Sequence, residues 1–430
     1  MGKPKNHASA MSRRSFLGRS LAAAAGPMIL PRHVLGMAGQ PGANDRVVTG
    51  HIGVGGQGQY LLDQFSENAG AVCDVDANHL QAALDKLGRR AYSCKDYREL
   101  LDREDIDAVV IATPDHWHGV QTVHACEAGK DVYCEKPASK TIAEGRAMME
   151  TARRYGRVVQ IGSQGRSTAD AHAACTYLRN GQLGAISKVA CWHIPNPTGG
   201  DPTKAGEPPA ELDWDLWLGP AAWRPYNPDY CHVLFRWMLD LGGGSIRDRG
   251  AHVFSVVQWC LDLDMTYPSR VTATGTPPLE GLWDVPTAME VVFEYDNPKL
   301  TITWGQPGVK GSEHEFGAVF HGEKGNLVLG GGDGGCFVDD AIRAYLPPED
   351  GVHPFRSPGH VRNFLDCVKS REKPVMDIQF GHRVATLCNL ADISYRVGRT
   401  LAFDPENETI VNDEQANRLL HTPGRGPWHV

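Results

Sequence analysis

The 430-residue sequence lacks three features that would each define a class of protein. No apolar run approaches the ~20 residues that cross a bilayer as a helix, so no stable membrane span is predicted. Positive charge is not in excess, and the formal net charge of -8 argues against a nucleic-acid partner, which would need a basic face. The eleven cysteines are scattered, odd in number and without a Cys-x-x-Cys pair. They indicate buried small side chains rather than a disulfide framework or a zinc site.

The composition that is present describes an ordinary globular chain. Hydrophobic residues make up 41% of the sequence and charged residues 22%. The length is too great for one small core and favours two domains with a tail. We find no internal repeat, and the one stretch of biased composition is a glycine- and proline-rich segment at 196–228.

Residues 1–38 are interpreted as a targeting segment rather than as part of the fold. The sequence from Ser12 to Leu17 (SRRSFL) is typical of a twin-arginine signal, and the alanine-rich stretch 21–30 that follows is too short to anchor the chain in a bilayer. That pathway exports proteins already folded and loaded with cofactor, so a periplasmic location is predicted. The alternative interpretation is a disordered basic tail.

The stretch around which the rest of the chain is organised is a glycine-rich turn. A run rich in β-branched residues (46–52) leads into Gly53-x-Gly55-x-x-Gly58, and an apolar helix-like pattern follows. This order is typical of a dinucleotide-binding turn, whose glycines permit the sharp bend, the approach of the pyrophosphate and close helix–strand packing. Asp74 ends the next strand-like run about 20 residues later, where a ribose-binding carboxylate belongs. NAD is therefore favoured over NADP, whose 2′-phosphate the carboxylate would repel. The alternative is a glycine-rich surface loop beside a β-hairpin.

Residues 45–165 alternate short strand patterns with helical patterns. The alternation predicts an α/β fold with a doubly wound parallel sheet of the Rossmann type, and ligands of such sheets bind beyond the C-terminal ends of the strands. The expected strands are 47–53, 71–75, 108–113, 131–135 and 157–162.

Residues 166–430 predict a second, α+β domain for substrate binding and oligomerisation. A helical pattern spans 246–261, and two more close the chain at 359–370 and 381–398. Short alternating strands at close spacing predict a mostly antiparallel open sheet, with one face covering the cofactor domain. The other face is available for self-association, so a homo-oligomer is expected. The expected strands are 269–274, 287–295, 299–304, 316–321 and 325–329.

Two polar stretches carry residues suited to proton transfer. Glu135-Lys136-Pro137 follows a buried strand, and a lysine there can orient a substrate hydroxyl and stabilise its developing charge. Asp248 and His252 share one helix face, so the carboxylate can fix the position and tautomer of a histidine that titrates near neutrality. The alternatives are a surface Glu-Lys pair and a structural Asp–His hydrogen bond. No third ligand with convincing spacing appears, so no metal site is predicted.

These motifs make the sequence similar to the Gfo/Idh/MocA family of oxidoreductases through nearly all of the chain after the signal. The glycine turn and two strand-end motifs resemble the cofactor domain of that family, and the remaining motifs resemble its exported, twin-arginine-bearing branch. The motifs outside the glycine turn are Thr113-Pro114-x-x-x-His118, Glu135-Lys136-Pro137, Trp214-x-x-Trp217-Leu-Gly-Pro-x-x-Trp223-Arg224-Pro, Gly243-Gly244-x-x-x-Asp248-x-Gly250-x-His252, His360-Val-Arg-Asn363 and Gly381-His382-Arg383.

The resemblance implies roles for particular residues. Lys136 and His252 correspond to the usual acid/base residues of the family, with Asp248 in support. Ser255 stands where the exported branch often has an acid, which puts the role of a carboxylate at that position in doubt. The residues expected to bind the cofactor are Gly53, Gly55, Gly56, Gln57, Gly58, Asp74, Thr113, Pro114, Trp117, His118, Glu135, Lys136, Gln164, Trp223 and Arg224.

The predicted function is that of an NAD(P)-dependent oxidoreductase acting on a secondary hydroxyl of a sugar, sugar derivative or cyclitol, with a tightly held nicotinamide cofactor. Two alternatives stay open. One is a redox-neutral NAD-dependent glycosidase that acts by transient oxidation, elimination and re-reduction. The other is a binding or sensor protein that kept the dinucleotide fold without activity, although such a protein would need neither Lys136 nor His252.

Overall fold

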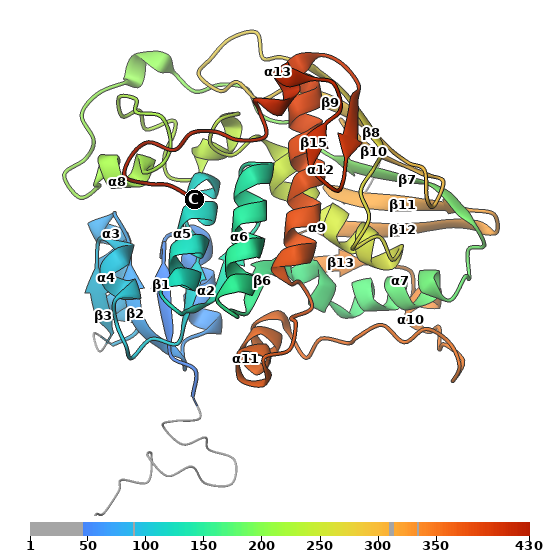
Figure 1. Ribbon diagram of the computed structural model, residues 1–430, viewed down its shortest axis with the longest axis horizontal. Helices are drawn as coiled ribbons and strands as arrows, with labels where there is room; N and C mark the ends of the chain where they lie inside the picture. Colours follow the sequence, from blue (N-terminus) through green and yellow to red (C-terminus); the bar gives the residue numbers. More distant parts are fainter. Residues whose placement is uncertain (1–45, 89–90, 309–313, 333–334) are drawn as a thin grey trace, which may run out of the picture. The chain divides into compact units, whose positions relative to one another are not determined.

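The computed structural model describes residues 46–430 apart from 89–90, 309–313 and 333–334. The targeting signal predicted at residues 1–38 lies outside these described residues. No helix in the described part of the chain is long and apolar enough to cross a membrane. Two β-sheets with helices against them make up residues 47–430 (Figure 1).

The first sheet confirms the predicted Rossmann architecture. Within the described residues it has six strands in the order β3-β2-β1-β4-β5-β6, and each neighbouring pair is parallel. The order reverses between β1 and β4, and ligands of doubly wound sheets bind at such a switch point. The strands are β1 (Thr49–Ile52), β2 (Ala69–Cys73), β3 (Tyr92–Cys94), β4 (Ala108–Ile111), β5 (Asp131–Glu135) and β6 (Val159–Gly162).

The helices between these strands begin at residues that satisfy their first N–H groups. Asp76 accepts from the backbone N–H groups of Asn78 and His79 at the start of α3. Thr141 and Glu144 form a reciprocal capping box at the start of α6. The helices are α2 (Gly56–Gln64), α3 (Ala77–Lys86), α4 (Tyr97–Leu101), α5 (Asp115–Glu127) and α6 (Ile142–Arg154).

The second sheet confirms the prediction of a mostly antiparallel, open sheet. Its order within the described residues is β13-β12-β11-β7-β10-β9-β8-β14-β15, and β7 with β10 is the one parallel pair among these strands. The strands are β7 (Ile186–His193), β8 (Arg270–Thr276), β9 (Ala288–Tyr295), β10 (Leu300–Gln306), β11 (Phe316–Gly322), β12 (Gly325–Gly332), β13 (Gly335–Phe337), β14 (Leu401–Asp404) and β15 (Thr409–Ile410).

Two long helices join the second sheet to the Rossmann sheet. Helix α9 contacts β7 and β11, while α12 contacts β8, α9 and also α6 of the first domain, beside which it runs in Figure 1. The helical elements of this part are η2 (Gln164–Ser167), α7 (Ala169–Arg179), η3 (Pro202–Lys204), α8 (Trp214–Leu218), η4 (Leu234–Trp237), α9 (Ser245–Cys260), α10 (Asp340–Arg343), α11 (His360–Ser370), α12 (Ile378–Val397) and α13 (Glu414–Asn417).

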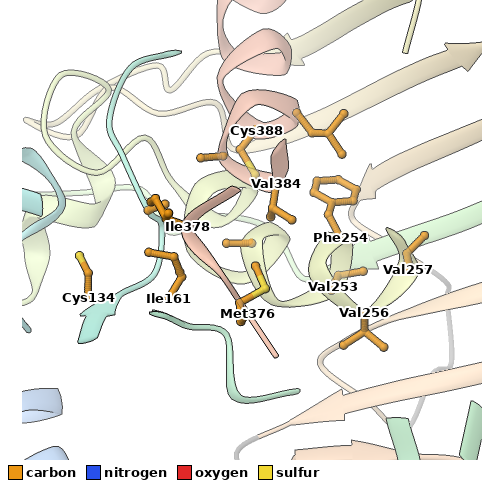
Figure 2. Close-up of a cluster of buried hydrophobic side chains, with 14 of the residues drawn as sticks. Cys134, Ile161, Val253, Phe254, Val256, Val257, Met376, Ile378, Val384 and Cys388 are labelled. Carbon is orange, nitrogen blue, oxygen red and sulfur yellow. The ribbon is translucent and has the colours of Figure 1, made fainter. Parts of the chain in front are cut away.

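The main core continues from one sheet into the other. Figure 2 shows Phe254 of α9 and Val384 and Cys388 of α12 in a buried cluster that also contains Cys134 of β5 and Ile161 of β6. Each aliphatic or aromatic side chain buried in this way stabilises the fold by about 1.5–3 kcal/mol. The shared core fixes the position of α9, and therefore of Asp248 and His252, relative to the Rossmann strand ends.

Among the elements that were not predicted from the sequence are β3, β7 and α7. Strand β3 has only three residues, and β7 begins with half-buried and exposed residues before its buried end, so neither shows a clear period of two. Helix α7 (Ala169–Arg179) precedes β7 in the chain, and its sequence does not show a strongly apolar helix face. Short or partly exposed elements give little periodicity, and tertiary contacts decide their conformation.

Candidate active site

A cavity of about 1150 Å³ opens along the C-terminal ends of β1, β2, β4 and β5. Its lining comes from the Rossmann strand ends on one side and from α9, β7, β11 and β12 on the other. Pockets for single small molecules have volumes of about 300–1,000 Å³. This cavity therefore has room for a dinucleotide together with a small substrate.

The glycine turn has the close contacts that only glycine allows. Gly53 has a φ of +80°, and a Cβ there would lie 2.9 Å from backbone atoms of Ala112 and Thr113. A Cβ on Gly58 would lie 2.0 Å from the carbonyl oxygen of Gly53, so this residue permits α2 to pack directly on β1. Helix α2 begins at Gly56 without a side-chain cap, which leaves its first N–H groups free to bind a phosphate.

Asp74 lies at the end of β2 and its carboxylate is fixed by the glycine turn. Oδ2 accepts from the backbone N–H of Val54 at 2.8 Å, and Oδ1 accepts from that of Asp76 at 2.9 Å. The imidazole of His79 lies 3.5 Å from Oδ2 and packs against Gly55, where a Cβ would be 2.8 Å from the ring. A cradle with open helix N–H groups and a fixed carboxylate fits the pyrophosphate and ribose of NAD.

Another part of the cavity lining is organised around Glu135. Its Oε1 accepts from the side-chain amides of Gln57 at 3.0 Å and Gln164 at 2.8 Å, which brings the glycine turn and η2 together. A Cβ on Gly162 would lie 2.6 Å from the carboxylate, so glycine there makes the space for it. Burial raises the pKa of the Glu135 carboxyl.

Lys136 forms an ion pair with Asp248 in the cavity lining. The two residues are 112 positions apart in the sequence. Asp248 Oδ2 also lies 3.6 Å from Nε of Arg236 and 3.9 Å from Nε of Arg249. Burial alone would raise the pKa of Asp248, but the charges of Lys136 and Arg236 outweigh that effect and hold it well below its usual range. The carboxylate therefore remains ionised and anchors the lysine ammonium.

His252 lies on α9, one turn after Asp248, and lines the same cavity. Burial and the charge of Lys136 lower the pKa of His252 to about 3, so the imidazole is neutral at physiological pH and able to accept a proton. Among the described residues no hydrogen bond from the His252 ring to the Asp248 carboxylate is found, and Asp248 instead accepts from Lys136.

The structure brings most of the predicted site residues to this cavity. Lys136, Asp248 and His252 line it, and so do most residues expected to bind the cofactor. Those lining residues are Gly53, Gly55, Gly56, Gln57, Asp74, Thr113, Pro114, Trp117, Glu135, Lys136 and Gln164.

Four predicted residues do not line the cavity. Gly58 lies beneath the turn, and His118 is buried with its ring nitrogens 2.7 Å and 2.9 Å from the carbonyl oxygens of Pro137 and Thr113. His118 thereby links the loops after β4 and β5. The Trp223 side chain is 65% exposed, and Arg224 pairs with Asp240. The cofactor roles predicted for Trp223 and Arg224 stay predictions.

Several lining residues were missed by the sequence interpretation. Asp115 begins α5, and burial raises its pKa to about 6. Arg236 and Arg249 come from η4 and α9, and His193 of β7 faces Glu315 at 3.3 Å. The charged residue inside Phe235-Arg236-Trp237 was a usable signal for Arg236. Asp115 and Arg249 lie within motifs that the sequence interpretation had quoted, whereas His193 reaches the cavity through the packing of β7, which leaves no local pattern.

Comparisons with known proteins identify the family. Residues 48–163 match the model described as "Oxidoreductase family, NAD-binding Rossmann fold", and residues 190–430 match "Oxidoreductase family, C-terminal alpha/beta domain", both of the Gfo/Idh/MocA group. The chain belongs to the Gfo/Idh/MocA oxidoreductase family, and its cofactor is NAD.

Relatives and solved structures agree with this assignment. An inositol 2-dehydrogenase of Salmonella typhimurium is 35% identical over 119 residues, which is 26% of this chain and 35% of the relative. A glycosyl hydrolase family 109 protein of Shewanella baltica is 32% identical over 169 residues, which is 33% of this chain and 37% of the relative. These matches therefore span well under half the length of either relative.

The fold is also similar to that of the WlbA dehydrogenase from Bordetella pertussis, whose structure is a complex with NADH and UDP-GlcNAcA. The TM-score is 0.62 at 18% sequence identity, and the superposition covers 84% of this chain and 99% of that one. At this identity the similarity supports the fold alone.

Proposed function

We propose that this protein transfers hydride between a secondary hydroxyl of a sugar, sugar derivative or cyclitol and a tightly held NAD. The observation that carries the proposal is the convergence of a neutral His252 and the Lys136–Asp248 pair on the cavity that also contains the glycine turn. A proton acceptor and a fixed cation beside a dinucleotide cradle are the groups that alcohol oxidation requires.

The residues of this chain have separable tasks in that reaction. When bound, NAD supplies the acceptor for the hydride that leaves the carbon. His252 accepts the hydroxyl proton, and the Lys136 ammonium donates a hydrogen bond to the same oxygen as negative charge develops on it. Asp248 keeps the ammonium in place, and the shared core beneath α9 keeps His252 in register with it.

The substrate class is supported by the relatives and by the cavity. The names of the relatives include an inositol dehydrogenase and a glycosyl hydrolase, so polyhydroxylated rings recur among them. The cavity lining includes carboxylate, guanidinium and imidazole groups, among them Arg236, Arg249 and His193. Such groups donate and accept hydrogen bonds with the hydroxyls of a sugar ring.

The rival function is a redox-neutral glycosidase. The similarity to glycosyl hydrolase family 109 proteins favours it, and the same His252 and Lys136 would serve the initial oxidation of a ring hydroxyl. A binding or sensor protein without activity is the less supported alternative, because dinucleotide binding alone needs neither residue.

A panel of sugars, cyclitols and aryl glycosides separates these functions. Each compound is incubated with the purified chain and assayed for NADH absorbance and for released aglycone. The proposal expects substrate-dependent NADH formation, or carbonyl reduction in the reverse direction. Release of aglycone without net NADH would establish the rival function. Binding of NAD with neither reaction across the panel would favour the sensor.

Export and cofactor retention form a linked proposal. The twin-arginine pattern supports a periplasmic location, where we expect no free nicotinamide pool, so the protein would hold one NAD through many turnovers. The tryptophan-rich segment 214–224 is the proposed cover, since Leu216 and Trp217 line the cavity and the Trp217 carbonyl accepts from the indole N–H of Trp117 at 3.1 Å.

Retention is tested by purifying the chain without added nucleotide, dialysing it at length and quantifying the nucleotide released on denaturation. Stoichiometric NAD is expected. An empty protein with reversible, millimolar binding would contradict retention, and NADP bound as tightly as NAD would contradict the role of Asp74.

Self-association through the exposed face of the nine-stranded sheet is likewise proposed, and light scattering of the purified chain tests it.

A further inference from the structure

A cluster of metal-ligating side chains lies beside the cavity, next to Asp74. Asp76 and His79 belong to the start of α3, and His232 comes from the loop before η4. One ligand atom from each of the three residues lies within 4.8 Å of the other two. His232 is 156 positions from Asp76, so no local spacing indicated a third ligand.

Asp76 offers one carboxylate oxygen to the cluster. The side chain is buried, and Oδ1 caps α3 by accepting from the backbone N–H groups of Asn78 at 2.7 Å and His79 at 3.3 Å. Oδ2 points instead to Nε2 of His232 at 3.1 Å. The helix cap therefore fixes the carboxylate while leaving one oxygen for a ligand.

His79 is oriented by a second carboxylate. Its Nδ1 lies 3.5 Å from Asp74 Oδ2. A carboxylate on one ring nitrogen places the proton there and leaves the lone pair of the other nitrogen, Nε2, for a metal. The rings of His79 and His232 have centroids 4.4 Å apart, so the two imidazoles converge beside Asp76.

We propose that Asp76, His79 and His232 bind one divalent transition-metal ion, with Zn²⁺ as the best fit. Two imidazole nitrogens and one carboxylate oxygen match the ligand preference of Zn²⁺, whose fourth position is then open to water. Ca²⁺ and Mg²⁺ prefer oxygen ligands, so a set with two histidines disfavours them. The proposal goes beyond the redox function and does not depend on it.

The ion would join two segments of the chain beside the cofactor cradle. Residues 211–213 already pair with the chain at the start of α3. Ala77 N donates to Glu211 O at 3.0 Å, and Asp213 N donates to Val75 O at 3.0 Å. His79 and His232 both line the cavity near Asp74. A bound ion would therefore hold the His232 loop against the cradle and slow the release of NAD.

Metal binding is measured directly on the untagged full chain. After treatment with a chelator, the protein is titrated with Zn²⁺ against a chromophoric competitor and with Co²⁺ in a visible absorption assay. We expect one high-affinity ion per chain and the visible spectrum of a four-coordinate Co²⁺ site. A binding stoichiometry near zero would overturn the proposal, and so would unchanged Zn²⁺ binding by His232→Ala and Asp76→Asn.

Substitutions of the proposed ligands distinguish a loss of Zn²⁺ binding from a loss of the folded structure. His232→Ala and Asp76→Asn are each expected to weaken Zn²⁺ binding at least about 10-fold. Asparagine caps a helix as well as aspartate does, so Asp76→Asn keeps α3 intact, which circular dichroism verifies. His353→Ala removes an exposed histidine elsewhere and should bind Zn²⁺ like the unmodified chain.

The link to the cofactor has its own measurement. Removing the ion should accelerate NAD release at least about 5-fold in the unmodified chain and leave the rate in His232→Ala unchanged. Equal release rates with and without Zn²⁺ would overturn the link. Because no substrate is present in these assays, failure of the proposed redox function and failure of the metal site are distinguishable.

Discussion

Two carboxylates, the half-buried Asp248 and the buried Glu408, lie among positive charges in different regions of the molecule. Asp248 has Lys136, Arg236 and Arg249 around it. Glu408 lies between β14 and β15. It accepts from Tyr267 Oη at 2.7 Å and Arg146 Nε at 2.8 Å, and it lies 2.8 Å from His382 Nε2. The pKa of each carboxyl is held below its usual range, for Glu408 at about 2.

The two carboxylates differ in whether their surroundings are closed by protein partners or open to the cavity. Both oxygens of Glu408 are occupied by partners from α6, α12 and the segment before β8, and Glu408 does not line the cavity. Asp248 lines the cavity, and two of its three cations lie at 3.6 Å or beyond. A closed arrangement stabilises the fold, whereas an open one keeps a cation ready for a substrate.

The largest expected effect concerns turnover at the open site. Lys136→Met and His252→Ala should each lower kcat by about 10²–10⁴-fold, because each removes a group that acts on the reacting oxygen. The free energy of unfolding and NAD binding should change little. Steady-state kinetics and urea denaturation check this, with the surface variants Lys324→Met and His353→Ala as controls. Near-unchanged turnover in either site variant would remove that residue from the mechanism.

The closed site should respond in the opposite way. Glu408→Gln is expected to lower the free energy of unfolding by about 3 kcal/mol, because it leaves the charge of Arg146 without its buried partner. The turnover of the folded fraction should stay within about twofold of the unmodified chain. Urea denaturation measures the loss, and Glu406→Gln, an exposed neighbour, is the matched control. A large drop in kcat at full folding would break the distinction between the two carboxylates.

The lowered pKa of Glu408 predicts that the free energy of unfolding decreases at acid pH. The pKa of Glu408 falls from an ordinary 4.5 to about 2 in the folded chain, so its contribution of about 3 kcal/mol is present above pH 4.5 and is lost as pH falls towards 2. Urea unfolding from pH 7 to pH 2.5 should show the gap between the unmodified chain and Glu408→Gln closing. A gap that is constant with pH would contradict the assigned pKa.

The smallest effect is expected for the anchor of the lysine. Asp248→Asn keeps the shape of the side chain but removes the charge that holds Lys136, so kcat should fall about 10-fold, the effect of a loss of about 1.4 kcal/mol. Substrate analogues should still bind, since the other lining groups remain. A loss as large as that of Lys136→Met would mean that Asp248 itself acts on the substrate.

The sequence was a good guide wherever one strand or helix places a residue by itself. Lys136 follows directly on β5, and His252 lies on the first turns of α9, so strand and helix patterns put both near the strand ends. The partner of Asp248 was not predictable in that way. The spacing of four suggested His252, whereas the fold supplies Lys136 from 112 positions away.

The glycine turn, a parallel doubly wound sheet and the resemblance to the family could all be predicted from the sequence, because motifs and burial periods lie in neighbouring residues. Which charged side chains meet depends on packing between segments that are far apart in the sequence. The Lys136–Asp248 pair and the Asp76–His79–His232 cluster each join segments more than a hundred positions apart. Such contacts depend on how helices and sheets pack over a shared core, and no local pattern records that packing.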